Sequence, residues 1–87
     1  MASFAGMDNQ QKIVIRYLPV ILRRFRYESG MTQEQLSERV GISASYLGMM
    51  EVGRRWPNID MLFRIADALA VPPDSIIRAV DEERKRH

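Results

Sequence analysis

Apolar residues in the middle of the chain recur at helical spacing on both sides of a glycine, Gly41. The pairs that carry this pattern are Leu36 with Val40 before the glycine and Leu47 with Met50 after it. Side chains three or four positions apart share one face of a helix, so each pair marks the buried side of a short amphipathic segment. Glycine readily adopts the positive φ that ends a helix in a tight turn. The pattern therefore predicts two short helices joined by a turn within residues 32–53.

Polar residues stand where these two helices would begin. Thr32 and Ser43 can each cap a helix, because a side-chain hydroxyl accepts a hydrogen bond from a backbone amide that the first turn leaves unpaired. Two helices joined by a short turn containing glycine form a helix-turn-helix, whose second helix can lie in the major groove of DNA. The positions of the second helix that face away from its apolar stripe are Ala44, Ser45, Gly48 and Met49.

This stretch and its flanks resemble the family of phage-repressor-like regulators that includes the lambda and 434 repressors and Cro, also called the XRE family. The resemblance covers roughly residues 18–77. It rests on the segments LRRFR (22–26), TQEQL (32–36), SYLGMMEVGRRWPN (45–58) and IADALAV (65–71), and on Gly41, Leu47 and Met50 at the turn and core positions of the family. It implies an all-α, five-helix, lambda-repressor-like domain that binds double-stranded DNA as a homodimer on a roughly palindromic operator, and regulates transcription.

The resemblance also implies roles for individual residues. Gln33 would stand at the start of the first motif helix and hydrogen-bond the DNA backbone, and Arg26 would form an ion pair with Glu51. Cations that directly follow the second helix favour phosphate contact, because each one that neutralises a phosphate releases counterions. The full set expected to contact phosphates is Gln33, Ser43, Tyr46, Arg54 and Arg55.

The residues expected to contact base edges are Ala44, Ser45, Gly48 and Met49. The family usually carries Gln, Arg, Lys or Asn at several of these positions, and such side chains pair with base edges. Readout here would rest on Ser45, on apolar contact with thymine methyl groups and on DNA shape. The alternative hypothesis is a protein-interaction module of the same fold, antitoxin-like or a co-regulator, with weak or lost base readout.

The region before the motif leaves two alternatives open. Residues 1–10 show no periodicity and are predicted to be a disordered leader, and the domain is expected to span residues 11–80. Apolar residues then follow a helical stripe, but Pro19 should break or kink a helix there. We favour a helix from about Pro19 to Ser29, preceded by a shorter helical segment; the alternative is an extended arm before Pro19.

Two further helices are predicted after the motif. The first opens at Asn58 or Asp60, and the second follows the break at residues 71–73 and ends in a charged tail, residues 81–87, that we expect to fray. The predicted core consists of Leu22, Phe25, Leu36, Val40, Leu47, Met50, Ile59, Leu62, Ile65 and Leu69. Ile76, Ile77 and Val80 give the last helix more apolar surface than one protomer can bury, which predicts a dimer interface.

Composition narrows the function classes. The chain has 87 residues, 46% of them apolar, and no cysteine, so disulfides and thiolate metal sites are excluded. Its net charge is only +2, but residues 12–55 hold the cationic excess that a nucleic-acid binder requires. His87, the only histidine, is terminal, and no base stands ready to activate a nucleophile, so we expect no enzyme. We likewise expect no cofactor, metal or small-molecule ligand, and a cytoplasmic protein without a membrane span.

Overall fold

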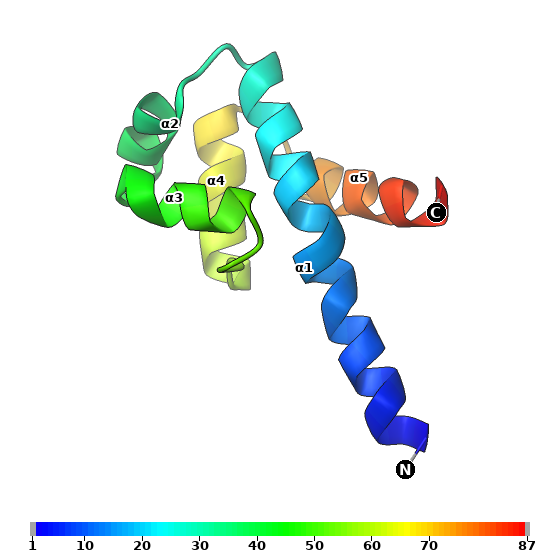
Figure 1. Cartoon of the computed structure of the whole chain (residues 1–87). Coiled ribbons are helices and arrows are strands. Elements are labelled where there is room, and N and C mark those ends of the chain that lie inside the picture. Colours follow the sequence, from blue (N-terminus) through cyan, green and yellow to red (C-terminus); the bar gives the residue numbers. More distant parts are fainter. Residues whose placement is uncertain (1, 87) are drawn as a thin grey trace.

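The structure, a computed structural model, describes residues 2–86, with side chains from Ile13 onward. This part of the chain folds into five helices and contains no strand (Figure 1). The helices are α1 (Ala2–Glu28), α2 (Gln33–Val40), α3 (Ala44–Glu51), α4 (Ile59–Leu69) and α5 (Pro73–Arg86). The predicted all-α, five-helix fold is confirmed. None of these helices is both long and apolar enough to cross a membrane.

All five helices contribute to one hydrophobic core. Its buried members are Leu18, Ile21, Leu22, Leu36, Val40, Leu47, Met50, Leu62, Ile65, Ala66, Leu69 and Ile76. Of the predicted core, Phe25 is only partly buried, and Ile59 was predicted wrongly, because 67% of it is exposed at the first turn of α4. Ile76 belongs to the core as well, although the sequence predicts it at a dimer interface.

Helix α1 runs without interruption through Pro19: the chain is helical on both sides of the proline, as favoured, but the expected break does not occur and there is no extended arm. A proline inside a helix leaves the carbonyl four residues earlier, here that of Ile15, without its usual donor. The turn after α3 packs at this point: a Cβ added to Gly53 would lie 3.2 Å from the Ile15 carbonyl oxygen and 3.5 Å from Pro19. The helix therefore continues through Pro19 at the place where the turn after α3 packs against it, although local propensity alone predicts a break.

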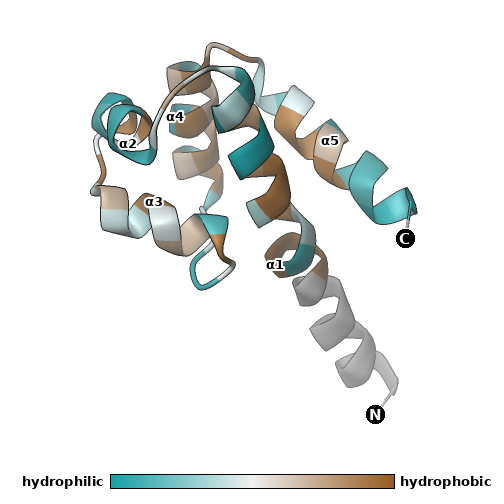
Figure 2. Ribbon diagram, turned by 45° about the horizontal axis from the view of Figure 1, so that its top comes forward, coloured by the Kyte–Doolittle hydropathy of each residue, from teal (hydrophilic) through white to brown (hydrophobic). Residues whose placement is uncertain are grey.

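Both ends of the described chain are helical. The backbone of the predicted disordered leader belongs to α1 from Ala2 onward. The predicted frayed tail is helical to Arg86, and His87 lies outside the described residues. Asp81 pairs with Arg84 and Lys85 within one turn of α5 (2.8 and 3.1 Å), and Glu83 pairs with Arg24 of α1 (3.0 Å). These pairs stabilise the polar second half of α5, which follows its apolar first half (Figure 2).

Candidate nucleic-acid interface

The α2–turn–α3 unit is built from the capping residues that the sequence predicted. At the start of α2 the Thr32 hydroxyl accepts from the Gln35 amide (3.1 Å), and the Gln35 side chain accepts from the Thr32 amide (2.9 Å). Gly41 ends α2 with φ 88°. Ser43 then caps α3 by accepting from the amide of Tyr46 at 3.0 Å. A side-chain cap thus fixes where each of these two eight-residue helices begins.

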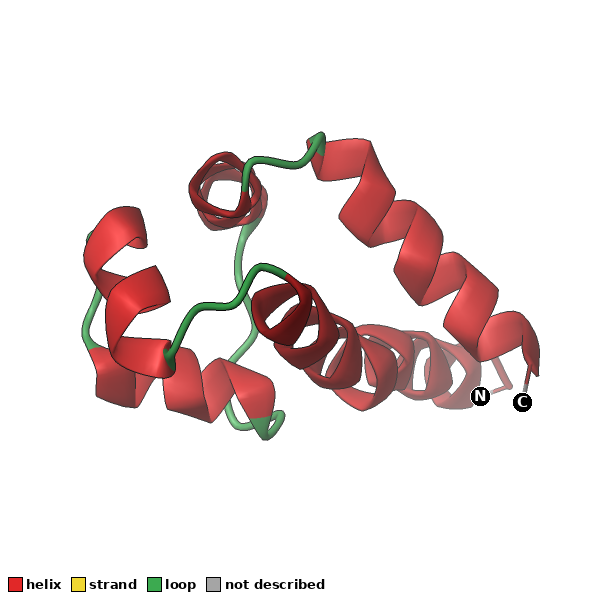
Figure 3. Cartoon of the chain, turned by 90° about the horizontal axis from the view of Figure 1, so that it is seen from above, coloured by secondary structure: helices red, strands yellow, loops and turns green. Residues whose placement is uncertain are grey.

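Helix α3 has one face in the core and one face directed outward. Leu47 and Met50 are almost completely buried. The four predicted base-contacting residues lie on the outer side, where Ser45 is exposed and Ala44, Gly48 and Met49 are half-buried. Seen from above, α3 forms an edge of the molecule with no other helix outside it (Figure 3). The structure therefore brings these four residues together on a surface that a large partner can reach.

A buried polar network fixes the C-terminal end of α3. Arg26 and Glu51 form the bidentate ion pair that the resemblance implied, with Nε–Oε2 and Nη2–Oε1 distances of 2.7 and 2.9 Å. Arg26 also donates to the Met31 carbonyl (3.1 Å) and lies 4.7 Å from the ring centre of Tyr27. One guanidinium thus joins α1 to α3 and to the loop that leads into α2.

The charges of this pair alter both pKa values. Burial alone would raise the pKa of Glu51, but the hydrogen bonds from Arg26 and Gln33 and the positive charge of Arg26 outweigh it and lower the pKa. The hydrogen bond to Glu51 raises the pKa of Arg26. Both groups are therefore charged at neutral pH, each compensating the other in a nearly dry site.

Gln33 is the third member of the network, a connection that the sequence does not predict. Its side-chain amide donates to Glu51 Oε1 at 3.0 Å and crosses the outer side of Gly48, where an added Cβ would lie 3.8 Å from it. A Cβ at position 48 would thus make only ordinary van der Waals contact with the Gln33 side chain. Because Gln33 and Glu51 are 18 positions apart, no local pattern could indicate the bond.

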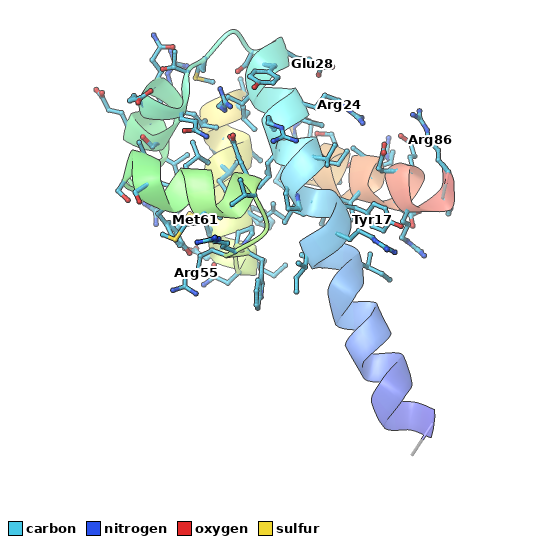
Figure 4. All side chains as sticks on the ribbon, in the orientation of Figure 1. Tyr17, Arg24, Glu28, Arg55, Met61 and Arg86 are labelled. Carbon is cyan, nitrogen blue, oxygen red and sulfur yellow. The ribbon has the colours of Figure 1, made fainter. Side chains whose placement is uncertain are left out.

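The cations after α3 are placed at the edge of this surface. The amides of Arg54 and Arg55 donate to the Met49 carbonyl (2.9 and 3.3 Å), so the backbone folds back against the end of α3. Both side chains are exposed, and Arg55 lies at the rim of the molecule beside α3 (Figure 4). Trp56 is 56% exposed and does not cover the core.

The residues predicted for a dimer interface separate into two groups. Ile76 is fully buried, so it cannot contact a second protomer and its assignment is corrected. Ile77 is exposed and Val80 half-buried. An apolar groove of about 240 Å³ lies beside them; its lining residues are Val14, Leu18, Pro57, Ile59, Leu62, Ile76, Ile77 and Val80. This groove joins α1, α4 and α5 on a surface that includes none of the predicted DNA contacts.

The geometry of the motif agrees with comparisons to known proteins. The sequence profile of the helix-turn-helix family matches residues 22–76. An HTH-type transcriptional regulator of Sinorhizobium fredii, y4dJ, is 41% identical over 68% of this chain and 77% of its own length. One of Methanothermobacter thermautotrophicus is 38% identical over 72% of this chain and 91% of its own length.

Solved structures show the same fold. The clp gene regulator ClgR of Corynebacterium glutamicum has a TM-score of 0.76 at 26% identity, over 80% of this chain and 91% of its own. The restriction-modification controller protein C.AhdI of Aeromonas hydrophila has a TM-score of 0.68 at 29% identity, over 76% and 97%. These relatives are regulators and not enzymes, as expected for this chain. The chain belongs to the helix-turn-helix family of transcriptional regulators, of the Cro/repressor type.

Proposed function

We propose that this protein is a sequence-specific DNA-binding transcriptional regulator that acts as a homodimer on a roughly palindromic operator. The observation that carries the proposal is α3 itself. Its inner face is fixed by Leu47 and Met50 in the core, and its outer face is left uncovered beside two exposed arginines. A helix with one anchored face and one accessible face is what the major groove admits.

The expected phosphate contacts surround this face. The amino-terminal ends of α2 and α3 offer backbone amides and the positive end of a helix dipole to an anion. Gln33 has a second N–H that makes no hydrogen bond among the described residues. The hydroxyl of Ser43 accepts from Tyr46, so its own proton remains available to a phosphate oxygen. Arg54 and Arg55 supply the charge that gives binding its salt dependence.

The homodimer is supported by the apolar groove between α1, α4 and α5. Ile59 and Ile77 are 67% and 53% exposed on its rim, an exposure of large apolar side chains that a second copy would reduce. An isologous contact there would relate two α3 helices by a dyad. Two such helices reach successive major grooves when they are about 34 Å apart, and the operator is then roughly palindromic.

The test is a selection of bound sequences from a random DNA pool, followed by titration of the selected duplex and of random duplex at several salt concentrations. We expect an enriched, roughly two-fold symmetric motif and an affinity that falls steeply as salt rises. If no sequence is enriched and no duplex binds at low salt, this function is wrong.

The alternative function is a protein-interaction module of the same fold. The observation that favours it is the chemistry of the outer face of α3, where Ala44, Gly48 and Met49 provide no side-chain donor to a base edge. The same salt titration separates the two functions, because a module without DNA contacts has no counterions to release.

A further inference from the structure

A side chain of α4 holds the C-terminal end of α2. Val40 is the last residue of α2, and its carbonyl accepts a hydrogen bond of 2.7 Å from Nη2 of Arg64. Carbonyls in the last turn of a helix have no partner within the helix, and a cation there also meets the negative end of the helix dipole. The earlier carbonyl of Ser37 is satisfied by the turn itself, through the amides of Gly41 (2.8 Å) and Ile42 (3.0 Å).

The guanidinium of Arg64 also packs against the glycine of the turn. A Cβ added at Gly41 would lie 3.0 Å from Arg64 Nη2, a tight approach that would require the guanidinium to shift slightly. Gly41 also has φ 88°, which favours glycine for conformational reasons. The backbone conformation at position 41 thus favours glycine, and a side chain there would also displace the guanidinium of Arg64.

Arg64 projects from an element that cannot easily move. Its neighbour Ile65 is completely buried, and α4 also buries Leu62, Ala66 and Leu69. Asp67 lines the same shallow depression as Arg64. Nevertheless, no ion pair of Arg64 occurs within 4.0 Å among residues 13–86. Its hydrogen bond goes to the backbone of α2 and not to a carboxylate. Arg64 thus caps the C-terminal end of a helix other than its own.

We propose that Arg64 is a positioning residue for DNA recognition: by holding the end of α2 and the turn at Gly41, it sets the angle at which α3 is presented. Helix α3 begins at Ala44, three residues after Gly41, so the backbone of the turn decides its direction. Recognition tolerates a displacement of only about 0.5 Å in its supporting elements. The role of Arg64 rests on the proposed DNA-binding function.

The substitution that tests this role is Arg64→Met, which keeps the aliphatic stem and removes the guanidinium. Arg39→Met is the matched control: Arg39 lines the same depression but makes no hydrogen bond or ion pair among the described residues. Both variants lose one charge from the same place. Below the melting temperature of both, we expect Arg64→Met to bind the selected operator about tenfold more weakly than the control. Affinity for random DNA and the salt slope should match the control, because no phosphate contact is lost.

A second measurement does not need DNA. Amide hydrogen exchange at Gly41 and Ile42 should be faster in Arg64→Met than in Arg39→Met, and Arg64→Lys, which restores a cationic donor, should slow it again. If exchange and the ratio of operator to random affinity are the same in Arg64→Met and Arg39→Met, the positioning role is overturned while DNA binding stands. A wild-type protein that binds no duplex overturns the proposed function instead, and the exchange rates then decide whether Arg64 holds the turn.

Discussion

Glu51 is a carboxylate with 2% of its side chain exposed, and side chains from two other helices bind it. Arg26 neutralises its charge from α1, and Gln33 reaches it from α2. Removing one member of such a site leaves the other charge buried and unpaired, which costs more than the pair contributes. The stability of the domain should therefore depend on this residue more than on any surface charge.

Glu51→Ala should lower the free energy of unfolding by about 3 kcal/mol or more, because Arg26 would remain buried without a counter-ion. Glu38→Ala is the control, since Glu38 is exposed and makes no ion pair among residues 13–86; surface changes of this kind stay within about 0.5 kcal/mol. Chemical denaturation of both variants measures the difference. An unchanged midpoint for Glu51→Ala would mean that the ion pair does not stabilise the fold.

The same residue predicts a pH dependence. The pKa of Glu51 is lower in the folded protein than its ordinary value of 4.5, so its contribution to stability is complete above that value. The contribution is lost as the pH falls below 4.5 and through the lower pKa of the folded state. Denaturation midpoints of wild type and Glu51→Gln, measured from neutral pH downward, should therefore converge at acidic pH; a constant difference would contradict this assignment.

Two glycines of the motif should respond oppositely to alanine. Gly48 lies inside α3 with a negative φ, and a Cβ there meets only the Gln33 side chain at an ordinary 3.8 Å. Gly48→Ala should therefore stabilise the fold by about 0.5–1 kcal/mol, yet weaken operator binding, because it thickens the proposed recognition surface. Gly41→Ala should destabilise the fold, since it combines a positive φ with contact to Arg64. Melting curves and operator titrations of both variants check this; a stabilised Gly48→Ala with unchanged affinity would remove residue 48 from the DNA contact.

At the scale of elements, α2 and α3 are each only eight residues long, shorter than a helix that is stable in isolation. Their caps at Thr32 and Ser43 and their burial of Leu36 and Leu47 supply what length does not. The outer face of α3 can therefore stay uncovered, while the orientation of α2 and α3 depends on the helices that they pack against. Binding energy and sequence preference should then arise from different parts of the unit.

Substitutions should separate these two parts. Arg54→Ala and Arg55→Ala should weaken binding to the operator and to random DNA alike, and each should lower the salt slope by about one. Ser45→Ala and Met49→Ala should mainly change which sequence is preferred, because they alter base contacts and not charge. Titrations on both kinds of DNA at several salt concentrations measure the separation. Intact affinity in both arginine variants, with loss of all binding in Ser45→Ala, would contradict this division.

At the scale of the whole molecule, the surface formed by Ile59, Ile77 and Val80 lies apart from the predicted DNA contacts. Ile77→Glu should convert a dimer to a monomer with little loss of fold, because Ile77 is 53% exposed. Ile76→Glu is the contrasting variant: Ile76 is completely buried, so the substitution should unfold the protein. Light scattering at tens of micromolar, with circular dichroism of both variants, gives the mass and the fold. A wild-type monomer, or a dimer unchanged by Ile77→Glu, would contradict the proposed interface.

Much of the fold and of the candidate site was determined by the sequence itself. The apolar pairs Leu36/Val40 and Leu47/Met50, the helix caps and the glycine turn each depend on residues that are close together in the sequence. The motif and its outward residues could therefore be predicted from local patterns. The Arg26–Glu51 pair was predicted through family resemblance, since its members are 25 positions apart.

Only the tertiary structure decided the rest. Pro19 lies inside α1, where the turn at Gly53 packs against the helix, although local propensity predicts a break. Ile59 and Ile76 exchange their predicted places, because burial depends on which helices lie opposite and not on hydrophobicity alone. The bonds from Gln33 to Glu51 and from Arg64 to Val40 join residues 18 and 24 positions apart. Such contacts leave no periodic trace in a single chain, because they are created when the helices pack together.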